Sequence, residues 1–382
     1  MRVLQVCTLI TPDAAYGGPV RVAVNQSRAL IEAGHDVTLL AGANGFGKNL
    51  PTEYDGVPVK LFQAHQAIPK TGFAGLLSPG LTSYLLRHPK PDVVHVHLAR
   101  DLITLPTAMW ARLGRIPYVL QTHGMIDPSR HPLTIPLDMF LTRPSLSGAE
   151  KVLYLTEVEK LGLEEVARNK IRLEKLENGV PLPSRPIPSP GTDTDMVEVL
   201  YLARLHPRKR PLSFVAMAKS LSVKYPHATF RLVGPDEGEA KATVSAIQAA
   251  ARGDALSWEG SIAPELALQR MSKASVYVLP SVNEPFPMSV LEAMSLGKPV
   301  VITDSCGLAE AVRDSGAGLV VDDTQEALDT AVGSILADDS RRLRMGQNAY
   351  RLAHEQFSMK PVLDSLTRTY QAALRTRTLD TV

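Results

Sequence analysis

A chain of 382 residues with 45% hydrophobic and 21% charged residues is typical of a globular protein with two domains. Its formal net charge of +2 excludes the strongly basic balance of a nucleic-acid-binding protein. Residues 1–185 hold 20 Lys and Arg against 16 Asp and Glu. This mild positive excess is compatible with weak attraction to an anionic membrane surface.

The cysteines and the hydropathy pattern indicate the compartment. The only two cysteines, Cys7 and Cys306, lie far apart and look like free thiols of a reducing compartment. The amino terminus enters a predicted strand without a signal-peptide layout, and no apolar run approaches the ~20 residues needed to span a bilayer. We therefore expect a cytoplasmic protein, at most peripheral at the inner face of the plasma membrane.

The first half of the chain alternates strands with helices. We predict strands at residues 3–9, 36–41, 57–62, 93–97, 117–122, 151–155 and 171–176, and helices at 20–33, 76–86 and 103–113. This alternation predicts a doubly wound, mostly parallel sheet. His95 and His97 alternate on one strand, and without a third ligand they read as structural histidines and not as a metal site.

A proline-rich stretch separates this domain from the next. Five prolines in residues 180–194 exclude a helix or a central strand. We therefore predict a first domain at residues 1–180, a linker at 181–196, and a second domain at 197–358 followed by a C-terminal helix in 359–382.

The second half repeats the α/β pattern. Strands are expected at residues 197–202, 229–233, 256–258, 276–279 and 318–321, and helices at 211–224, 239–251, 264–274, 308–314, 325–337, 340–357 and 361–377.

Two glutamates eight residues apart are the most informative feature. Glu284 follows the strand at 276–279, where open α/β sheets bind ligands. The short helix that follows starts near Met288 and Ser289, and its free N–H groups and positive dipole end favour phosphate. Glu292, about one turn inside that helix, can accept hydrogen bonds from ribose hydroxyls.

This segment resembles the E-x7-E motif of retaining glycosyltransferases of family 4, which have the GT-B architecture. The shared features are the preceding strand, Pro280-Ser281, Phe286, and the trailing Leu-Glu-Ala-Met-x-x-Gly-Lys-Pro-Val that starts at Leu291. The resemblance implies an α/β fold of two Rossmann-like domains facing a cleft, with the C-terminal helix crossing back to the first domain. It also implies that Glu284 binds sugar hydroxyls, and that Phe286, Met288, Ser289 and Glu292 belong to the same substrate-binding site.

The loop after the strand at 197–202 supplies positive charge. Arg204 and Lys209 lie five residues apart, and Arg offers a planar fork of donors while Lys offers a point charge. The loop resembles the family's Gly-Arg-Leu-x-x-x-Lys-Gly element, which implies that both side chains hold the donor diphosphate. Ala203 and Arg210 replace the two glycines of that element.

Two segments of the first domain complete the candidate site. Gly17 and Gly18 precede a helix, where glycine lets the backbone approach a ligand and the helix terminus favours an anion. By resemblance they lie near the donor phosphate and the acceptor. His123 stands at a strand's carboxyl end within Thr-His-Gly, and by resemblance its carbonyl and ring fix the donor sugar.

Pro287 is a further departure, because the family usually has glycine there. Proline lacks an N–H donor and suits the first helical position.

These features predict a retaining glycosyltransferase without a cofactor or metal, in which Arg204, Lys209 and the helix terminus neutralise the leaving diphosphate. The donor would be a UDP-, GDP- or ADP-linked sugar and the acceptor a glycan or a lipid-linked molecule. The expected role is in cell-surface polysaccharide biosynthesis. The alternatives are a sugar-nucleotide-binding protein that does not transfer, and an epimerase or phosphorylase on the same fold.

Residues 127–147 mix apolar and basic side chains. They either contact a lipid-linked acceptor at a membrane surface or pack a helix on the sheet. The base, the sugar and the linkage stay open.

Overall fold

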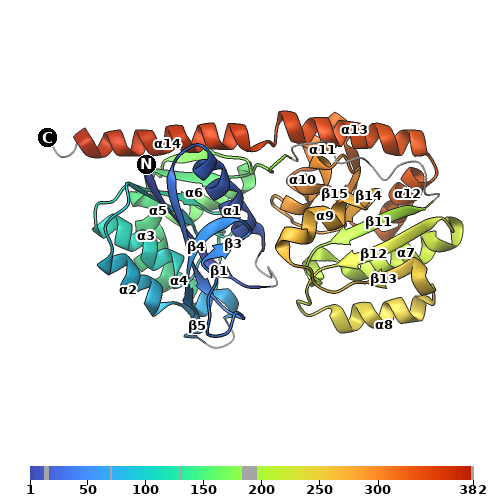
Figure 1. Cartoon of the computed structure of the whole chain (residues 1–382), viewed down its shortest axis with the longest axis horizontal. Coiled ribbons are helices and arrows are strands. Elements are labelled where there is room, and N and C mark those ends of the chain that lie inside the picture. Colours follow the sequence, from blue (N-terminus) through green and yellow to red (C-terminus); the bar gives the residue numbers. More distant parts are fainter. Residues whose placement is uncertain (13–16, 69–70, 130, 183–195, 380–382) are drawn as a thin grey trace. The chain divides into compact units, whose positions relative to one another are not determined.

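The computed structural model describes residues 1–12, 17–68, 71–129, 131–182 and 196–379. The chain divides into two compact units, Met1–Gly179 with Met359–Val382 as unit 1 and Val180–Ser358 as unit 2 (Figure 1). Of the linker predicted at 181–196, residues 183–195 lie outside the described residues.

Unit 1 is built on an eight-stranded sheet in the order β10-β9-β8-β7-β1-β2-β4-β3. Neighbouring strands are parallel except β3 and β4. The strands are β1 Arg2–Ile10, β2 Asp36–Ala43, β3 Glu53–Tyr54, β4 Val57–Gln63, β7 Val93–His97, β8 Tyr118–Gln121, β9 Lys151–Tyr154 and β10 Leu173–Lys175, while β5 His65–Gln66 and β6 Leu76–Leu77 form a separate antiparallel pair.

Helices cover this sheet on both faces. They are α1 Gly17–Glu32, α2 Pro79–Arg87, α3 Thr104–Leu113, α4 Thr134–Leu137, α5 Arg143–Gly148, α6 Glu157–Ala167 and α14 Met359–Leu379, with a 3-10 turn at Gly72–Gly75 and a π-helical turn, η2, at Asp138–Thr142. Consecutive residues of β1 enter different cores: Val3 packs in one, and Leu4 in the other. Parallel strands buried on both faces read as continuous apolar runs, as β1 does.

Unit 2 contains a six-stranded parallel sheet in the order β13-β12-β11-β14-β15-β16. Its strands are β11 Val197–Leu202, β12 Ala228–Val233, β13 Leu256–Trp258, β14 Val276–Leu279, β15 Val300–Thr303 and β16 Gly318–Val321. Its helices are α7 Pro211–Lys224, α8 Ala240–Ala250, α9 Ala267–Ser272, α10 Met288–Ser295, α11 Ala309–Ser315, α12 Gln325–Leu336 and α13 Asp339–Glu355, with 3-10 turns at Pro207–Lys209 (η3), Gly253–Ala255 and Pro264–Leu266.

The last helix belongs to unit 1. Val362, Leu366 and Tyr370 of α14 are buried against Val3, Val93 and other strand residues of that unit's sheet. The predicted return of the C-terminal helix to the first domain is therefore confirmed, as is the expectation of two Rossmann-like α/β domains.

Two predicted helices have different bounds in the structure, and one helix was not predicted. The helix predicted at residues 76–86 begins only at Pro79, because Leu76–Leu77 pairs with β5 and proline suits a helix start. The helix predicted at 264–274 is a 3-10 turn followed by the short α9. Helix α6 was not anticipated. Residues 134–148 are helical, in agreement with helix packing as one of the two alternatives for residues 127–147.

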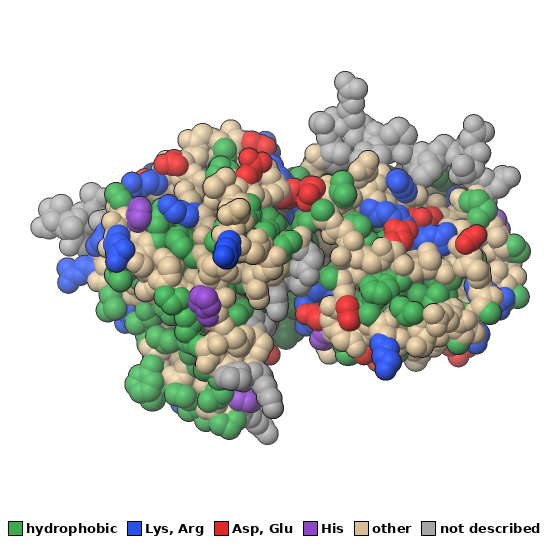
Figure 2. Space-filling view, turned by 60° about the horizontal axis from the view of Figure 1, so that its bottom comes forward, with side chains coloured by type: hydrophobic (Ala, Val, Ile, Leu, Met, Phe, Trp, Pro, Cys, Tyr) green, Lys and Arg blue, Asp and Glu red, His purple; other side chains and the backbone are tan. Residues whose placement is uncertain are grey.

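The distribution of surface charge and the state of the two cysteines agree with the expectations from the composition. Acidic and basic side chains are interspersed on the face drawn in Figure 2. Cys7 and Cys306 are buried free thiols. Among the helices of the described residues, none is long and apolar enough to cross a bilayer.

Packing of α14 makes a stability prediction. Leu366 is 1% exposed in the unit 1 core, so Leu366→Ala removes buried methyl groups and should lower the free energy of unfolding in urea by about 2–5 kcal/mol. Leu161→Ala on α6 is the matched control, since Leu161 is 65% exposed. Equal, small effects of both substitutions would show that α14 does not contribute to the core of unit 1.

Candidate active site

The sheet of unit 2 changes direction between β11 and β14. The chain runs outward from β11 through β12 to β13 on one side, and from β14 through β15 to β16 on the other. Open α/β sheets bind ligands at the carboxyl ends of the strands beside such a switch point. The loops that follow β11 and β14 carry Arg204, Lys209 and Glu284, and the Val282 N–H donates to the Arg208 carbonyl at 3.1 Å, which joins the two loops.

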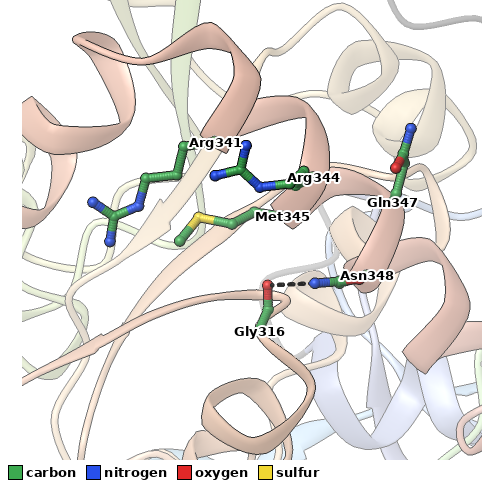
Figure 3. A pocket seen from close by; sticks show the side chains of 6 residues that line it. All are labelled: Gly316, Arg341, Arg344, Met345, Gln347 and Asn348. Carbon is green, nitrogen blue, oxygen red and sulfur yellow. Dashed lines mark hydrogen bonds between the residues drawn. The ribbon is translucent and has the colours of Figure 1, made fainter.

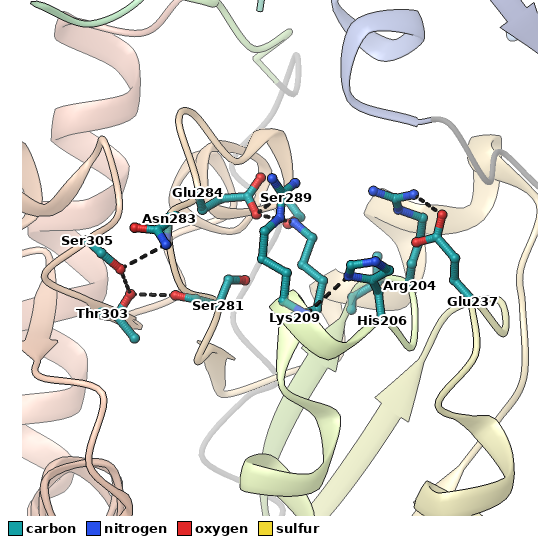
Figure 4. Close-up of polar contacts among 12 residues, drawn as sticks. Arg204, His206, Lys209, Glu237, Ser281, Asn283, Glu284, Ser289, Thr303 and Ser305 are labelled. Carbon is teal, nitrogen blue, oxygen red and sulfur yellow. Dashed lines mark hydrogen bonds and ion pairs between the residues drawn. The ribbon is translucent and has the colours of Figure 1, made fainter. Parts of the chain in front are cut away.

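A buried ion pair lies at this point. Lys209 Nζ is 2.6 Å from Glu284 Oε2, and the two residues are 9% and 8% exposed (Figure 4). Arg208 approaches the same carboxylate oxygen at 3.9 Å. Burial lowers the pKa of Lys209, although the adjacent Glu284 charge opposes the shift. The residue predicted to bind the diphosphate, Lys209, therefore touches the residue predicted to bind the sugar, Glu284.

Backbone geometry positions both partners. Lys209 ends the 3-10 turn η3, whose cap is His206, with Nδ1 accepting from the Arg208 N–H at 3.1 Å. Before Glu284, Asn283 adopts a φ of 52°, in the left-handed region that Asn tolerates better than most residues. Its N–H donates to Ser305 Oγ at 3.0 Å (Figure 4). The Glu284 carbonyl accepts from the Gly307 N–H at 2.9 Å.

Arg204 also has a carboxylate partner. Its guanidinium pairs with Glu237, in the loop after β12, and its side chain remains 28% exposed (Figure 4). The Tyr201 hydroxyl donates to the Arg204 carbonyl at 2.9 Å and holds the backbone. Glu237 was missed from the sequence, although it follows a strand-Gly-Pro turn at the same edge of the sheet.

Helix α10 starts beside the ion pair. Pro287 occupies the cap position, one residue before the first helical position predicted for it, so Met288 and Ser289 supply the first helical N–H groups. Helix geometry leaves such N–H groups without intrahelical acceptors. Ser289 Oγ accepts from the Tyr277 hydroxyl at 2.7 Å, and Glu292 is 5% exposed one turn inside.

Phe286 contacts an aromatic side chain. Its ring packs edge to face on Phe357 at a centroid separation of 5.9 Å, and the Phe357 carbonyl accepts from the Val180 N–H at 2.7 Å. Phe286 therefore anchors the loop of Glu284 within unit 2.

His123 of unit 1 lies in a turn directly after β8. Its φ is 52° and that of Gly124 is 72°. The ring stacks on His97 at a centroid separation of 5.1 Å, and His123 Nε2 is 2.8 Å from His97 Nδ1. His97 in turn stacks on His95, and both are fully buried, as a structural role requires.

Gly17 and Gly18 open α1. A Cβ built at Gly18 meets no atom within 4 Å, so crowding by the described residues does not explain the glycine there.

A separate hollow lies on unit 2. A pocket of about 400 Å³ is lined by Gly316, Arg341, Arg344, Met345, Gln347 and Asn348 (Figure 3). It shares no lining residue with the predicted site. In the described part of the chain, no three His, Cys, Asp or Glu side chains group as metal ligands.

Two family models match successive parts of the chain. The "Glycosyl transferase 4-like domain" matches residues 17–179, and "Glycosyl transferases group 1" matches residues 187–352. The chain belongs to the group 1 glycosyltransferases. A member of this family is a transferase of the glycosyl-transferring type.

Relatives and solved structures of glycosyltransferases span the chain. Glycogen synthase of Mycobacterium tuberculosis is 26% identical over 410 residues, which cover 98% of this chain and 95% of that protein. Sucrose-phosphate synthase from Thermosynechococcus elongatus superimposes with a TM-score of 0.77 at 19% identity, over 98% of this chain and 100% of that one. Anabaena HepE in complex with UDP and glucose gives 0.75 at 18% identity, over 97% and 99%.

The histidine stack of this glycosyltransferase predicts acid sensitivity. Burial lowers the pKa of His95 to about 3, from 6.5 for an unperturbed imidazole. Between these values the unfolded state binds more protons than the folded state, so stability falls as the pH drops from about 6.5 toward 3. For this one group the loss at pH 5 should be about 2 kcal/mol.

Urea unfolding at pH 7.5 and pH 5, for the wild type and His95→Gln, measures this effect. The variant should lose about 2 kcal/mol less than the wild type on acidification. The same pH dependence in both proteins would contradict a neutral, buried His95.

Proposed function

We propose that this glycosyltransferase is a retaining enzyme that moves a sugar from a nucleotide-diphosphate sugar to a glycan or a lipid-linked acceptor. The observation that carries the proposal is the buried pair of Lys209 and Glu284 at the switch point of unit 2, beside the start of α10. HepE, which has a similar fold, binds UDP, glucose and UDP-glucose, which supports a nucleotide-sugar donor.

Charge neutralisation is the proposed source of catalysis. The leaving diphosphate gains negative charge in the transition state, and preorganised donors in a water-poor site stabilise such charge. Lys209 has three N–H donors, of which Glu284 takes one. The others, together with Arg204 and the N–H groups of Met288 and Ser289, would hold the diphosphate.

Glu284 would bind sugar hydroxyls. Both Lys209 and Arg208 approach Oε2, so Oε1 is the oxygen better placed to accept from a hydroxyl. A carboxylate stabilised by a cation at 2.6 Å is a weak nucleophile. The acceptor would therefore attack on the face that the diphosphate leaves, and a diphosphate oxygen would take its proton.

The other predicted residues have supporting roles in this proposal. Glu292 would accept from the ribose, Phe286 would anchor the loop of Glu284, and His123 would fix the donor sugar by its carbonyl and ring. Gly17 and Gly18 would let the donor phosphate or the acceptor approach the start of α1.

We place the reaction in cell-surface polysaccharide biosynthesis, with peripheral contact at the inner face of the plasma membrane. The segment of α4 and η2 supports this, because it exposes four large apolar side chains by half or more: Leu133, Ile135, Met139 and Phe140. Such a surface suits a lipid-linked acceptor.

The departures from the family motif are compatible with transfer. Arg210 adopts a φ of 54°, where glycine would be relaxed, and its guanidinium donates to the Asp323 carbonyl at 2.7 Å. This contact holds the loop of Lys209 despite the substitution, so the non-transferring alternative gains no support from Arg210.

Removal of either phosphate-binding cation should abolish transfer. Arg204→Ala and Lys209→Ala should each lower kcat/KM by roughly 100-fold or more, because one electrostatic donor to developing charge is lost. Nucleotide release from UDP-, GDP- and ADP-sugars measures the rate, and Lys219→Ala, on the exposed face of α7, is the control. Full activity in both site variants would exclude the diphosphate assignment.

The stereochemistry is tested on the product. Proton NMR should show the anomeric configuration of the donor kept in the transferred sugar. An inverted product would contradict attack from the leaving-group face.

A further inference from the structure

Glu159 departs from the usual role of its position. It lies three residues after Thr156, the N-cap of α6, and Thr156 Oγ1 accepts from the Glu159 N–H at 3.2 Å. In an ordinary capping box this glutamate bonds back to the N-cap N–H. Here the carboxylate accepts hydrogen bonds from other groups instead. The residue is buried, with 8% of its surface exposed.

The carboxylate binds the turn of His123. Oε1 accepts from Thr122 Oγ1 at 2.5 Å and from the Gly124 N–H at 2.6 Å, the residues on either side of His123. Oε2 accepts from the Leu155 N–H at 2.7 Å, after β9. One buried acceptor therefore ties the turns after two neighbouring strands.

That turn needs an external restraint. His123 and Gly124 are both in the left-handed region, with φ of 52° and 72°. A side chain in this region is disfavoured unless surrounding contacts impose it. The two bonds from Glu159 Oε1 supply such contacts and set the direction of the His123 carbonyl.

His97 restrains the ring from the opposite side. Its Nε2 is 2.9 Å from Gln5 Oε1, and its Nδ1 is 2.8 Å from His123 Nε2. Because the side-chain amide oxygen of Gln5, Oε1, can only accept, His97 carries its proton on Nε2 and accepts a hydrogen bond on Nδ1. His123 Nε2–H is then the donor, and Nδ1 is the acceptor that this ring presents.

We propose that Glu159 and His97 are positioning residues for His123, one setting its backbone carbonyl and the other its ring and tautomer. Neither touches the substrate. The inference rests on the proposed function, in which His123 contacts the donor sugar.

Glu159→Gln is the first test. An amide replaces one carboxylate oxygen by a donor, so it cannot accept from all of Thr122, Gly124 and Leu155. We expect kcat to fall at least tenfold, with nucleotide binding by calorimetry unchanged, because the side chains proposed to bind the diphosphate and the ribose, Arg204, Lys209 and Glu292, are in unit 2. Glu157→Gln is the matched control, since Glu157 is 65% exposed on the same helix and pairs with Lys160.

His97 supplies an independent pair of variants. His97→Asn keeps an acceptor near the position of Nδ1 and should retain most activity, whereas His97→Leu removes it and should lose at least tenfold in kcat. Nitrogen-15 NMR of labelled histidine should show His123 protonated on Nε2 in the wild type and in His97→Asn, and a mixture of tautomers in His97→Leu. If Glu159→Gln fails to fold, the comparison of His97→Asn with His97→Leu still tests whether His123 is positioned by its neighbours.

His123→Ala separates the two proposals. Full activity of His123→Ala would refute the role of His123 in the proposed function. Loss of activity there, with wild-type kcat in Glu159→Gln and His97→Leu, would overturn the positioning inference alone. A parallel loss of nucleotide binding in either variant would also overturn it, because the effect would be general damage to the fold.

Discussion

The buried contact between Lys209 and Glu284 is the constraint on which the site of unit 2 depends. Two opposite charges that are each less than a tenth exposed stabilise one another only while both are in place, since removal of one leaves the other desolvated and unpaired. The contact forms because β11 and β14 are neighbours in the sheet although 75 residues separate the two side chains. The left-handed turn at Asn283 and the cap at His206 then follow as the local geometry that brings each side chain to the pair.

In unit 1 a polar network has the comparable role. Gln5, His95 and His97 lie on the face of the sheet that α14 covers, and the Tyr370 hydroxyl of α14 is 2.6 Å from His95 Nδ1. The C-terminal helix therefore contributes more than apolar area to this unit, because its Tyr370 hydroxyl supplies a buried hydrogen-bond partner to His95.

The strands and helices of the site were largely predictable from the sequence, but the contacts between its side chains were not. Strands β11 and β14 and helix α7 begin and end where periodicity and flanking Pro or Gly residues place them. The local pattern and the family resemblance each singled out Glu284 and Lys209, but neither predicted that the two side chains form an ion pair. The contacts of Arg204 with Glu237 and of Glu159 with Thr122 likewise join residues 33 and 37 positions apart. Helix α6 did carry a local signal, the capping-box spacing of Thr156 and Glu159.

The central claim is that Lys209, Arg204 and the start of α10 bind the diphosphate of the donor. The most direct test compares the affinity of the wild-type protein for a nucleoside diphosphate with its affinity for the monophosphate of the same base. Calorimetric titration with UDP and UMP, and with the guanosine and adenosine pairs, isolates the second phosphate, which Lys209, Arg204 and the start of α10 are proposed to hold. The account predicts that the diphosphate of the preferred base binds at least tenfold more tightly, about 1.4 kcal/mol, and that added salt narrows the difference. Equal affinity for diphosphate and monophosphate would contradict it.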